Sequence, residues 1–213
     1  MEEYSAWIIL VLGKLLPVLK STVVLYVAIP LIIKFLPQVV AQGAFLNLVC
    51  PPLRFLKLSQ PERWGLTNVI NQYITGPDNL KLGLWHIRPE YDRHLQDAAK
   101  VFIYCHGNAG HRGFGHRNLI FKVFQSLGFH VIAFDYRGFG DSEGWPTQHG
   151  VIQDTVAVYE WVVQHTTSDC KIFLWGHSLG TSIATHAVAQ VQENTSNPPR
   201  GLILESPFTS LND

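Results

Sequence analysis

A single pentapeptide, Gly176-His177-Ser178-Leu179-Gly180, has the G-x-S-x-G pattern of a serine nucleophile. In this pattern a sharp turn between a strand and a helix exposes the serine hydroxyl, and the flanking glycines remove side chains that would collide in the turn. The required context is present, because the apolar run Lys171–Trp175 precedes the pentapeptide and a helical pattern over Thr181–Glu193 follows it. We therefore predict that Ser178 attacks an acyl carbonyl carbon.

The oxyanion formed by such an attack needs hydrogen-bond donors. One donor is expected to be the backbone N–H of Leu179, which follows the nucleophile. The second is expected from the loop His106-Gly107-Asn108-Ala109-Gly110, which follows a short apolar strand. We assign this donor to the N–H of Asn108, with that of Ala109 as the alternative. His106 is predicted to brace the loop as a buried structural histidine.

Other residues in the same region suggest different chemistry. His106, His111 and His116 recur every five residues in a glycine-rich loop, but this spacing matches no common zinc pattern, so no metal site is predicted. Cys105 ends an apolar strand and is expected to belong to the core rather than to act as a nucleophile.

The glycines Gly138, Gly140 and Gly144 resemble a dinucleotide-binding loop, with Asp135 as a ribose ligand. However, they form G-x-G-x-x-x-G and follow a middle strand rather than opening the first βαβ unit. The pattern is therefore weak, and no cofactor is predicted.

Strands and helices alternate beyond residue 66. Asn68–Thr75 and Leu80–Arg88 alternate apolar and polar residues around the turn sequence Gly-Pro-Asp-Asn, which predicts a β-hairpin. Further strands are predicted over 101–105, 130–136, 171–175 and 201–205, and helices over 117–127, 151–165 and 181–193. This order predicts an α/β fold with a mostly parallel sheet and helices on both faces. Ligands of such sheets bind at the carboxyl ends of the strands, so functional residues are expected after positions 105, 136, 175 and 205.

The composition excludes several classes of protein. Only 15% of the 213 residues are charged, 47% are hydrophobic, and sixteen basic residues balance sixteen acidic ones. A neutral chain lacks the basic field of a nucleic-acid-binding protein. Three cysteines cannot form a disulfide scaffold or a four-cysteine zinc site.

The N-terminal part is predicted to associate with a membrane. From Ser21 to Leu53 the sequence carries a single charge, Lys34, which is enough apolar length for a bilayer span. Because Glu2 and Glu3 stand where a basic region is expected, a cleaved signal peptide fits poorly. We predict an N-terminal flank over 1–20, a transmembrane segment over 21–40, a juxtamembrane linker over 41–66 and a partial α/β domain over 67–213. An interfacial or re-entrant segment is the alternative to a span.

Four motifs carry a resemblance to a known family: HGNAG (106–110), DYRGFGDS (135–142), WGHSLGT (175–181) and LESPFT (204–209). Together they resemble the α/β-hydrolase fold, and within it the membrane-anchored monoacylglycerol and lysophosphatidylserine lipases of the α/β-hydrolase-domain proteins. The resemblance implies a serine hydrolase of acyl esters, anchored by one span in the endoplasmic reticulum membrane with its catalytic side in the lumen. Ser182 stands where the family commonly has glycine, and Gly115 where it usually has aspartate. The sequon at Asn194 is a candidate glycosylation site.

In this fold the catalytic triad runs in the order Ser, Asp or Glu, His. The histidine that follows Ser178 is His186, in the helix that the nucleophile begins, and Glu205 has no evident histidine to orient. We therefore expect that the chain lacks the triad acid and histidine, is a truncated product, isoform or partial gene model, and is inactive as given. The alternative function is a non-catalytic interaction or regulatory protein with a hydrolase fold.

Overall fold

In the N-terminal unit of the chain, residues 2–35 form one long helix. The computed structural model describes residues 2–35, 43, 45–47, 57–91, 94–192 and 197–207, and the chain divides into two units, 1–44 and 45–213. Helix α1 (Glu2–Phe35) contains two prolines. Its stretch Gly13–Ile32 has a mean hydropathy of 2.0 and is long and apolar enough to cross a membrane. The helix begins well before the predicted segment 21–40, and residues 36–40 of that segment lie outside the described residues.

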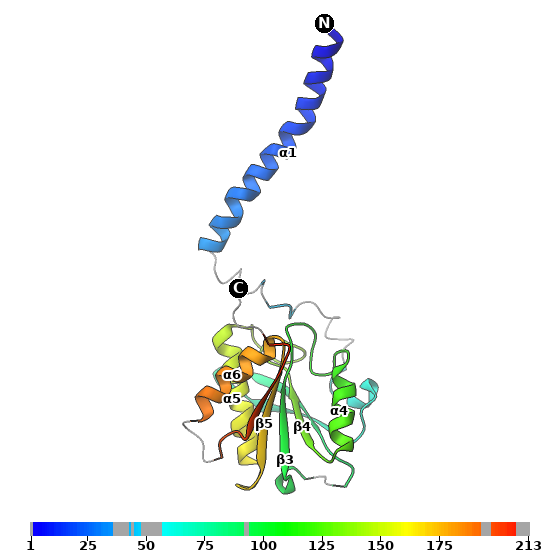
Figure 1. Ribbon diagram of the computed structural model, residues 1–213, viewed down its shortest axis with the longest axis vertical. Helices are drawn as coiled ribbons and strands as arrows, with labels where there is room; N and C mark the ends of the chain where they lie inside the picture. The colour runs from blue at the N-terminus through cyan, green and yellow to red at the C-terminus, as the bar shows by residue number, and fades with distance from the viewer. Residues whose placement is uncertain are drawn as a thin grey trace. The chain divides into compact units, whose positions relative to one another are not determined.

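The described part of the second unit contains one six-stranded sheet in the order β1-β2-β4-β3-β5-β6 (Figure 1). β1 and β2 form an antiparallel hairpin, β2 also pairs antiparallel with β4, and the remaining neighbours pair parallel. This arrangement confirms the predicted α/β fold and its hairpin. The strands are β1 (Val69–Thr75), β2 (Lys81–Ile87), β3 (Lys100–Cys105), β4 (His130–Phe134), β5 (Lys171–His177) and β6 (Gly201–Glu205).

Helices cover both faces of this sheet. Figure 1 shows α4 (Arg117–Ser126) on one side, and α5 (Gln148–Gln164) and α6 (Leu179–Gln192) on the other. Along β3, Val101, Ile103 and Cys105 join the core that contains α5 and α6, whereas Phe102 and Tyr104 join the core that contains Phe121 of α4. Because side chains alternate along a strand and both faces are covered, the parallel strands are continuous apolar runs in the sequence. In the described part of the chain, three short 3₁₀ helices lie between strands or before them, at Pro61–Trp64, Pro77–Asn79 and Leu95–Asp97.

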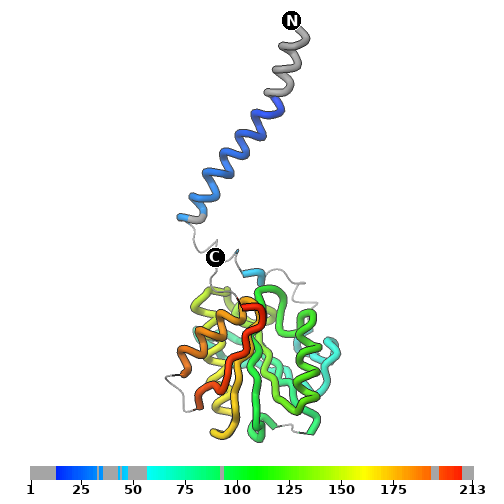
Figure 2. The backbone as a smooth tube through the Cα atoms, in the orientation of Figure 1, coloured from blue at the N-terminus to red at the C-terminus, as the bar shows by residue number. Residues whose placement is uncertain are grey.

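Capping residues set the helix boundaries. α4 ends as predicted, because Gly128 adopts a left-handed φ of +80° and donates its N–H to the carbonyl of Gln125. α5 begins three residues before the predicted Val151, because the Thr147 hydroxyl accepts a hydrogen bond from the N–H of Gly150 at 3.0 Å. The parallel strands β3, β5 and β6 run side by side, so their carboxyl ends meet at one edge of the sheet (Figure 2).

Candidate active site

Ser178 lies in a sharp turn between β5 and α6. Its φ is +51°, in the left-handed region that a non-glycine residue rarely adopts. The Ser178 N–H donates to the carbonyl of Glu205 at 2.9 Å, and its own carbonyl accepts from the N–H of Thr181 at 2.8 Å. The predicted strand–turn–helix context is therefore confirmed. Strained backbone of this kind costs on the order of 1–3 kcal/mol and is found mainly at functional sites.

The two glycines of the pentapeptide allow the backbone to approach closely. A Cβ at Gly180 would lie 1.9 Å from the carbonyl oxygen of Cys105, at the end of β3. A Cβ at Gly176 would lie 2.3 Å from the carbonyl oxygen of Gly180. Neither distance is sterically possible, so only glycine fits at these two positions and the turn packs directly against β3.

The same contact brings the loop 106–110 next to the turn. β3 pairs with β5 so that Cys105 lies opposite Gly176, and a Cβ at Gly107 would lie 2.9 Å from Nδ1 of His177. Leu179 is the first residue of α6, where N–H groups have no partner within the helix. The side-chain oxygen of Asn108 accepts a hydrogen bond from the N–H of Leu46 at 3.0 Å. The assignment of the Leu179 and Asn108 N–H groups to an oxyanion hole stays a prediction.

His106 is a structural residue, as predicted. Its ring is fully buried, packs against Tyr136 with ring centroids 4.4 Å apart, and its Nδ1 lies 2.7 Å from the carbonyl oxygen of Gly107. Burial lowers the pKa of His106, and the nearby Asp135 carboxylate only partly opposes this shift. Nε2 of His106 lies 3.4 Å from that carboxylate without an aligned hydrogen bond.

Asp135 and Arg112 form a fully buried ion pair. The Arg112 guanidinium lies 2.5 Å from Asp135 and 2.6 Å from Asp141. Burial alone would raise the pKa of Asp135, but the positive charge of Arg112 outweighs it and lowers this pKa to about 2. A Cβ at Gly140 would lie 2.0 Å from the same carboxylate. The glycine-rich segment after β4 therefore packs around a buried ion pair, and Asp135 has no exposed oxygen to offer a ribose.

Arg117 and His111 complete this buried group. Arg117 donates to the carbonyls of Ala109 and His111, and it is almost fully buried. His111 contacts Trp64 with ring centroids 4.7 Å apart, and burial lowers its pKa to about 4. We call the five residues that hold the loop the buried network: His106, His111, Arg112, Arg117 and Asp135.

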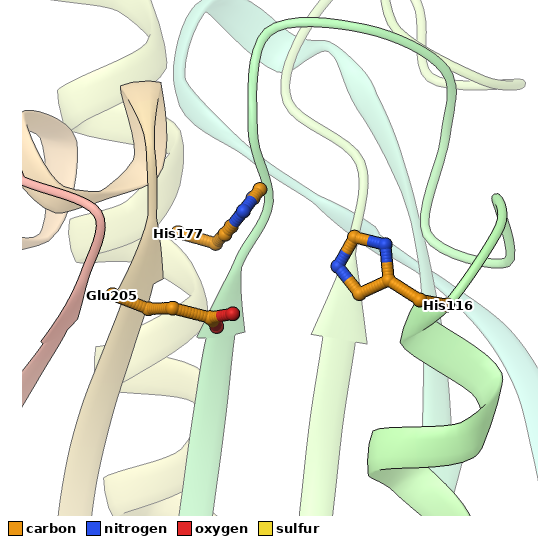
Figure 3. A group of neighbouring side chains, drawn as sticks. All are labelled: His116, His177 and Glu205. Atoms are coloured by element: carbon orange, nitrogen blue, oxygen red, sulfur yellow. The ribbon is translucent and has the colours of Figure 1, made fainter.

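A second group of side chains at this edge was not anticipated from the sequence. His116, His177 and Glu205 have donor atoms that all lie within 4.8 Å of one another. Figure 3 shows His177 and Glu205 extending from one side and His116 from the other, with the three side chains pointing toward one another. His116 is exposed, and the other two are half-buried. We call these three residues the open cluster.

The open cluster corrects one expectation about Glu205. The sequence suggested no histidine to accompany it, but β5 and β6 pair so that His177 lies directly opposite Glu205. The negative charge of Glu205 raises the pKa of His177, although burial outweighs it and the net shift is downward. The sequence could have indicated this pair, because both residues end neighbouring strands. The sequence could not place His116 beside them, because His116 precedes a helix and does not end a strand.

Further sequence expectations concern Cys105, His186 and Asn194. Cys105 is fully buried and burial raises its pKa to about 12, which confirms its place in the core. His186 is exposed and its ring bonds to the carbonyl of Ser182 in its own helix. All ten histidines lie among the described residues, and none of them is hydrogen-bonded to the Ser178 hydroxyl there. Asn194 lies outside the described residues.

Comparison with known proteins identifies the family. Residues 100–212 match the family described as alpha/beta hydrolase fold, which is more than half of the chain. The chain belongs to the α/β-hydrolase fold family. An esterase of Pyrococcus furiosus has a similar structure, with a TM-score of 0.52 and 28% identity, covering 62% of this chain and 49% of the esterase. A Vibrio vulnificus α/β hydrolase shares the fold with a TM-score of 0.56 at 19% identity, covering 68% of this chain and 49% of that one.

Within the α/β-hydrolase family the sequence is similar to lysophosphatidylserine lipases. The chain is 40% identical to lysophosphatidylserine lipase ABHD12 of Danio rerio over 89% of this chain and 52% of the relative. It is 41% identical to the Xenopus tropicalis lipase of the same name, with the same coverage, and 38% identical to protein ABHD12B of Homo sapiens over 72% of this chain and 45% of that protein. The chain thus spans about half the length of the curated relatives that it matches.

Proposed function

We propose that this protein is a serine hydrolase that cleaves acyl esters of lysophospholipids, including lysophosphatidylserine, and of monoacylglycerols. Ser178 is the nucleophile: its oxygen bonds to the acyl carbon while its proton passes to a general base. The glyceryl oxygen then leaves with a proton, and water hydrolyses the acyl-serine to release the fatty acid. The observation that carries this proposal is the left-handed backbone of Ser178 between β5 and α6, which supports a nucleophile elbow.

The oxyanion hole is assigned to the N–H groups of Leu179 and Asn108. The steric contact between Gly180 and the end of β3 supports this assignment, because it holds the first turn of α6 against the loop that contains Asn108. Removing one such donor typically costs 10²- to 10³-fold in kcat.

The substrate class rests on the relatives, whose names specify lysophosphatidylserine. Helix α1 supports a lipid substrate independently, because an apolar stretch over Gly13–Ile32 would keep the hydrolase domain at a membrane where such lipids reside. We propose a single-pass anchor in the endoplasmic reticulum membrane with residues 67–213 on the lumenal side. Carbonate extraction should leave the protein in the membrane pellet, and a glycan on Asn194 would support the lumenal side.

The decisive experiment labels the native protein in its own membranes with a fluorophosphonate probe. We expect the probe on the peptide that contains Ser178, as identified by mass spectrometry. Ser178→Ala should abolish labelling and lower ester hydrolysis by several orders of magnitude. Ser206→Ala is the matched control, because Ser206 also has a left-handed φ, of +54°, but follows β6 and lies outside the G-x-S-x-G pentapeptide. Labelling that persists in Ser178→Ala would refute the assignment.

A second candidate is a non-catalytic protein of the same fold that binds partners at the membrane. The observation that favours it is that no histidine among these residues is hydrogen-bonded to the Ser178 hydroxyl, and a serine without an adjacent base is a weak nucleophile. The two candidates differ in the labelling experiment, since a non-catalytic protein leaves Ser178 unlabelled in native membranes. We expect the 213 residues assayed alone to turn over lysophosphatidylserine at close to the rate of their Ser178→Ala variant.

A further inference from the structure

The open cluster combines two imidazoles and one carboxylate at the carboxyl edge of the sheet. Their donor atoms come from the residue before α4, the last residue of β5 and the last residue of β6 (Figure 3). We propose that His116, His177 and Glu205 bind one divalent transition-metal ion of the zinc class. This proposal concerns binding and does not depend on Ser178 being catalytic.

The donor set selects this class of ion. Two histidine nitrogens and one carboxylate are a common three-ligand set for zinc, with water in the fourth position. Imidazole suits zinc, copper, nickel and iron, whereas calcium and magnesium bind oxygen ligands. Two of the three donors here are imidazole nitrogens, so a hard cation is disfavoured.

The geometry requires only small side-chain movements. Zinc bonds of 2.0–2.1 Å in a tetrahedral site place donor atoms about 3.4 Å apart. The donors already lie within 4.8 Å of one another. His116 is exposed and stands at the N-cap of α4, where its side chain can rotate, and the Glu205 side chain has three rotatable bonds. His177 lies against Gly107 and provides the fixed ligand.

Unsatisfied polar atoms give an independent reason for a ligand. Nδ1 of His177 and Oε2 of Glu205 are shielded from solvent and have no hydrogen-bond partner among the described residues. Leaving such groups unpaired is costly, and a bound ion can supply the partner that they lack. Nε2 of His106 is also shielded and unpaired among the described residues, but the carboxylate beside it, Asp135, already accepts hydrogen bonds from Arg112 at both oxygens. A cation bound by Nδ1 of His177 and Oε2 of Glu205 would give both atoms a partner.

The experiment titrates the full 213-residue chain in detergent micelles with Zn²⁺ against a chromogenic chelator. We expect one equivalent to bind, and Co²⁺ in its place to give the intense visible absorption of a four-coordinate site. His116→Gln and Glu205→Gln should each weaken zinc binding by more than the roughly 10- to 100-fold lost when an outer-shell partner is removed. Circular dichroism of each variant verifies that it is folded. Because His116 is exposed, its substitution should leave the fold intact.

His186→Gln is the matched control, since His186 is an exposed histidine on α6 outside the cluster. This variant should bind zinc as tightly as the wild-type chain. Any of three results would overturn the proposal: no stoichiometric zinc binding, unchanged affinity in both His116→Gln and Glu205→Gln, or an equal loss in His186→Gln.

Discussion

The buried network and the open cluster both combine histidines with a carboxylate, and both adjoin the loop after β3. In the buried network, Asp135 and Arg112 are fully buried and both carboxylate oxygens accept hydrogen bonds from Arg112. In the open cluster, His116 is exposed, and His177 and Glu205 each keep a shielded atom without a partner among the described residues. The carboxylate is therefore paired with an arginine in the buried network, whereas the carboxylate of the open cluster keeps an oxygen without a partner among the described residues.

The difference follows from the cost of removing charges from water. A buried charge is tolerated only when it is paired and hydrogen-bonded, and such groups then fix the backbone around them. At the edge of the sheet, His177 and Glu205 keep shielded atoms without a partner among the described residues, so a bound ligand would stabilise them. We infer that the buried network shapes the loop that contains Asn108, whereas the open cluster is free to bind. The following substitutions test this division.

The largest effect is expected from Asp135→Asn. It leaves the buried Arg112 guanidinium with the neutral side-chain oxygen of Asn71 and with one carboxylate, that of Asp141, which is 27% exposed. Breaking a buried ion pair by removing one partner typically costs about 3–5 kcal/mol. Urea unfolding of the full chain in detergent, followed by tryptophan fluorescence, measures this loss.

Asp141→Asn is the control for Asp135→Asn, because Asp141 also pairs with Arg112 but is partly exposed. Its loss of stability should be clearly smaller, since water screens the exposed carboxylate. If both variants lose the same free energy of unfolding, burial does not distinguish the two carboxylates. That result would contradict the importance given to the buried network.

The fold of the second unit is accessible from the sequence because its signals are local. β3, β4 and β5 are apolar on both faces, and Gly128 and the Gly-Pro-Asp-Asn turn mark chain reversals. The start of α5 differed from the predicted position because a single hydrogen bond, between Thr147 and Gly150, sets it. Helix α1 begins before the predicted segment 21–40 and contains Pro17, which an apolar membrane helix tolerates better than a soluble helix does.

The candidate site was only partly accessible. Ser178 is marked by a contiguous motif, so one pentapeptide suffices to find it. The open cluster consists of three residues from distant segments, and its assembly depends on the register of β5 with β6 and on the position of α4. The histidine spacing 106, 111, 116 gave no indication of the open cluster, because the fold buries the first two and places His116 beside residues from other strands.

Substituting a histidine in each group gives the next largest effect. His106→Ala removes a ring that packs against Tyr136 and Phe139 and leaves the carbonyl of Gly107 without its contact. We expect a loss of about 3 kcal/mol in the free energy of unfolding. His116→Ala should change it by less than about 0.5 kcal/mol, because the residue is exposed. Equal losses in the two variants would contradict the division.

Acidification should weaken the buried network. The folded pKa of His111 is lowered to about 4, below its unfolded value near 6.5, so the unfolded chain binds a proton that the folded chain resists. The stability that depends on a neutral His111 is complete above pH 6.5 and is lost as the pH falls toward 4. Between pH 7 and pH 5 the free energy of unfolding of the wild-type chain should therefore fall by about 2 kcal/mol more than that of His111→Gln. Parallel pH dependence of the two chains, measured by urea unfolding, would show that His111 is not buried neutral.

The smallest effect is expected from Gly115→Asp, which introduces the residue that the family resemblance implies at this position. Gly115 has a φ of +63°, a Cβ at this position would have no atom within 4 Å, and aspartate tolerates this conformation better than most residues. A carboxylate at the N-terminus of α4 gains about 0.3–1 kcal/mol from the helix dipole, which offsets the backbone strain, so stability should change by less than about 1 kcal/mol. Because the new charge stands beside His116, zinc affinity should rise several-fold. Gly115→Asn has the same shape without the charge, and an equal rise in that variant would mean that the carboxylate does not act on the open cluster.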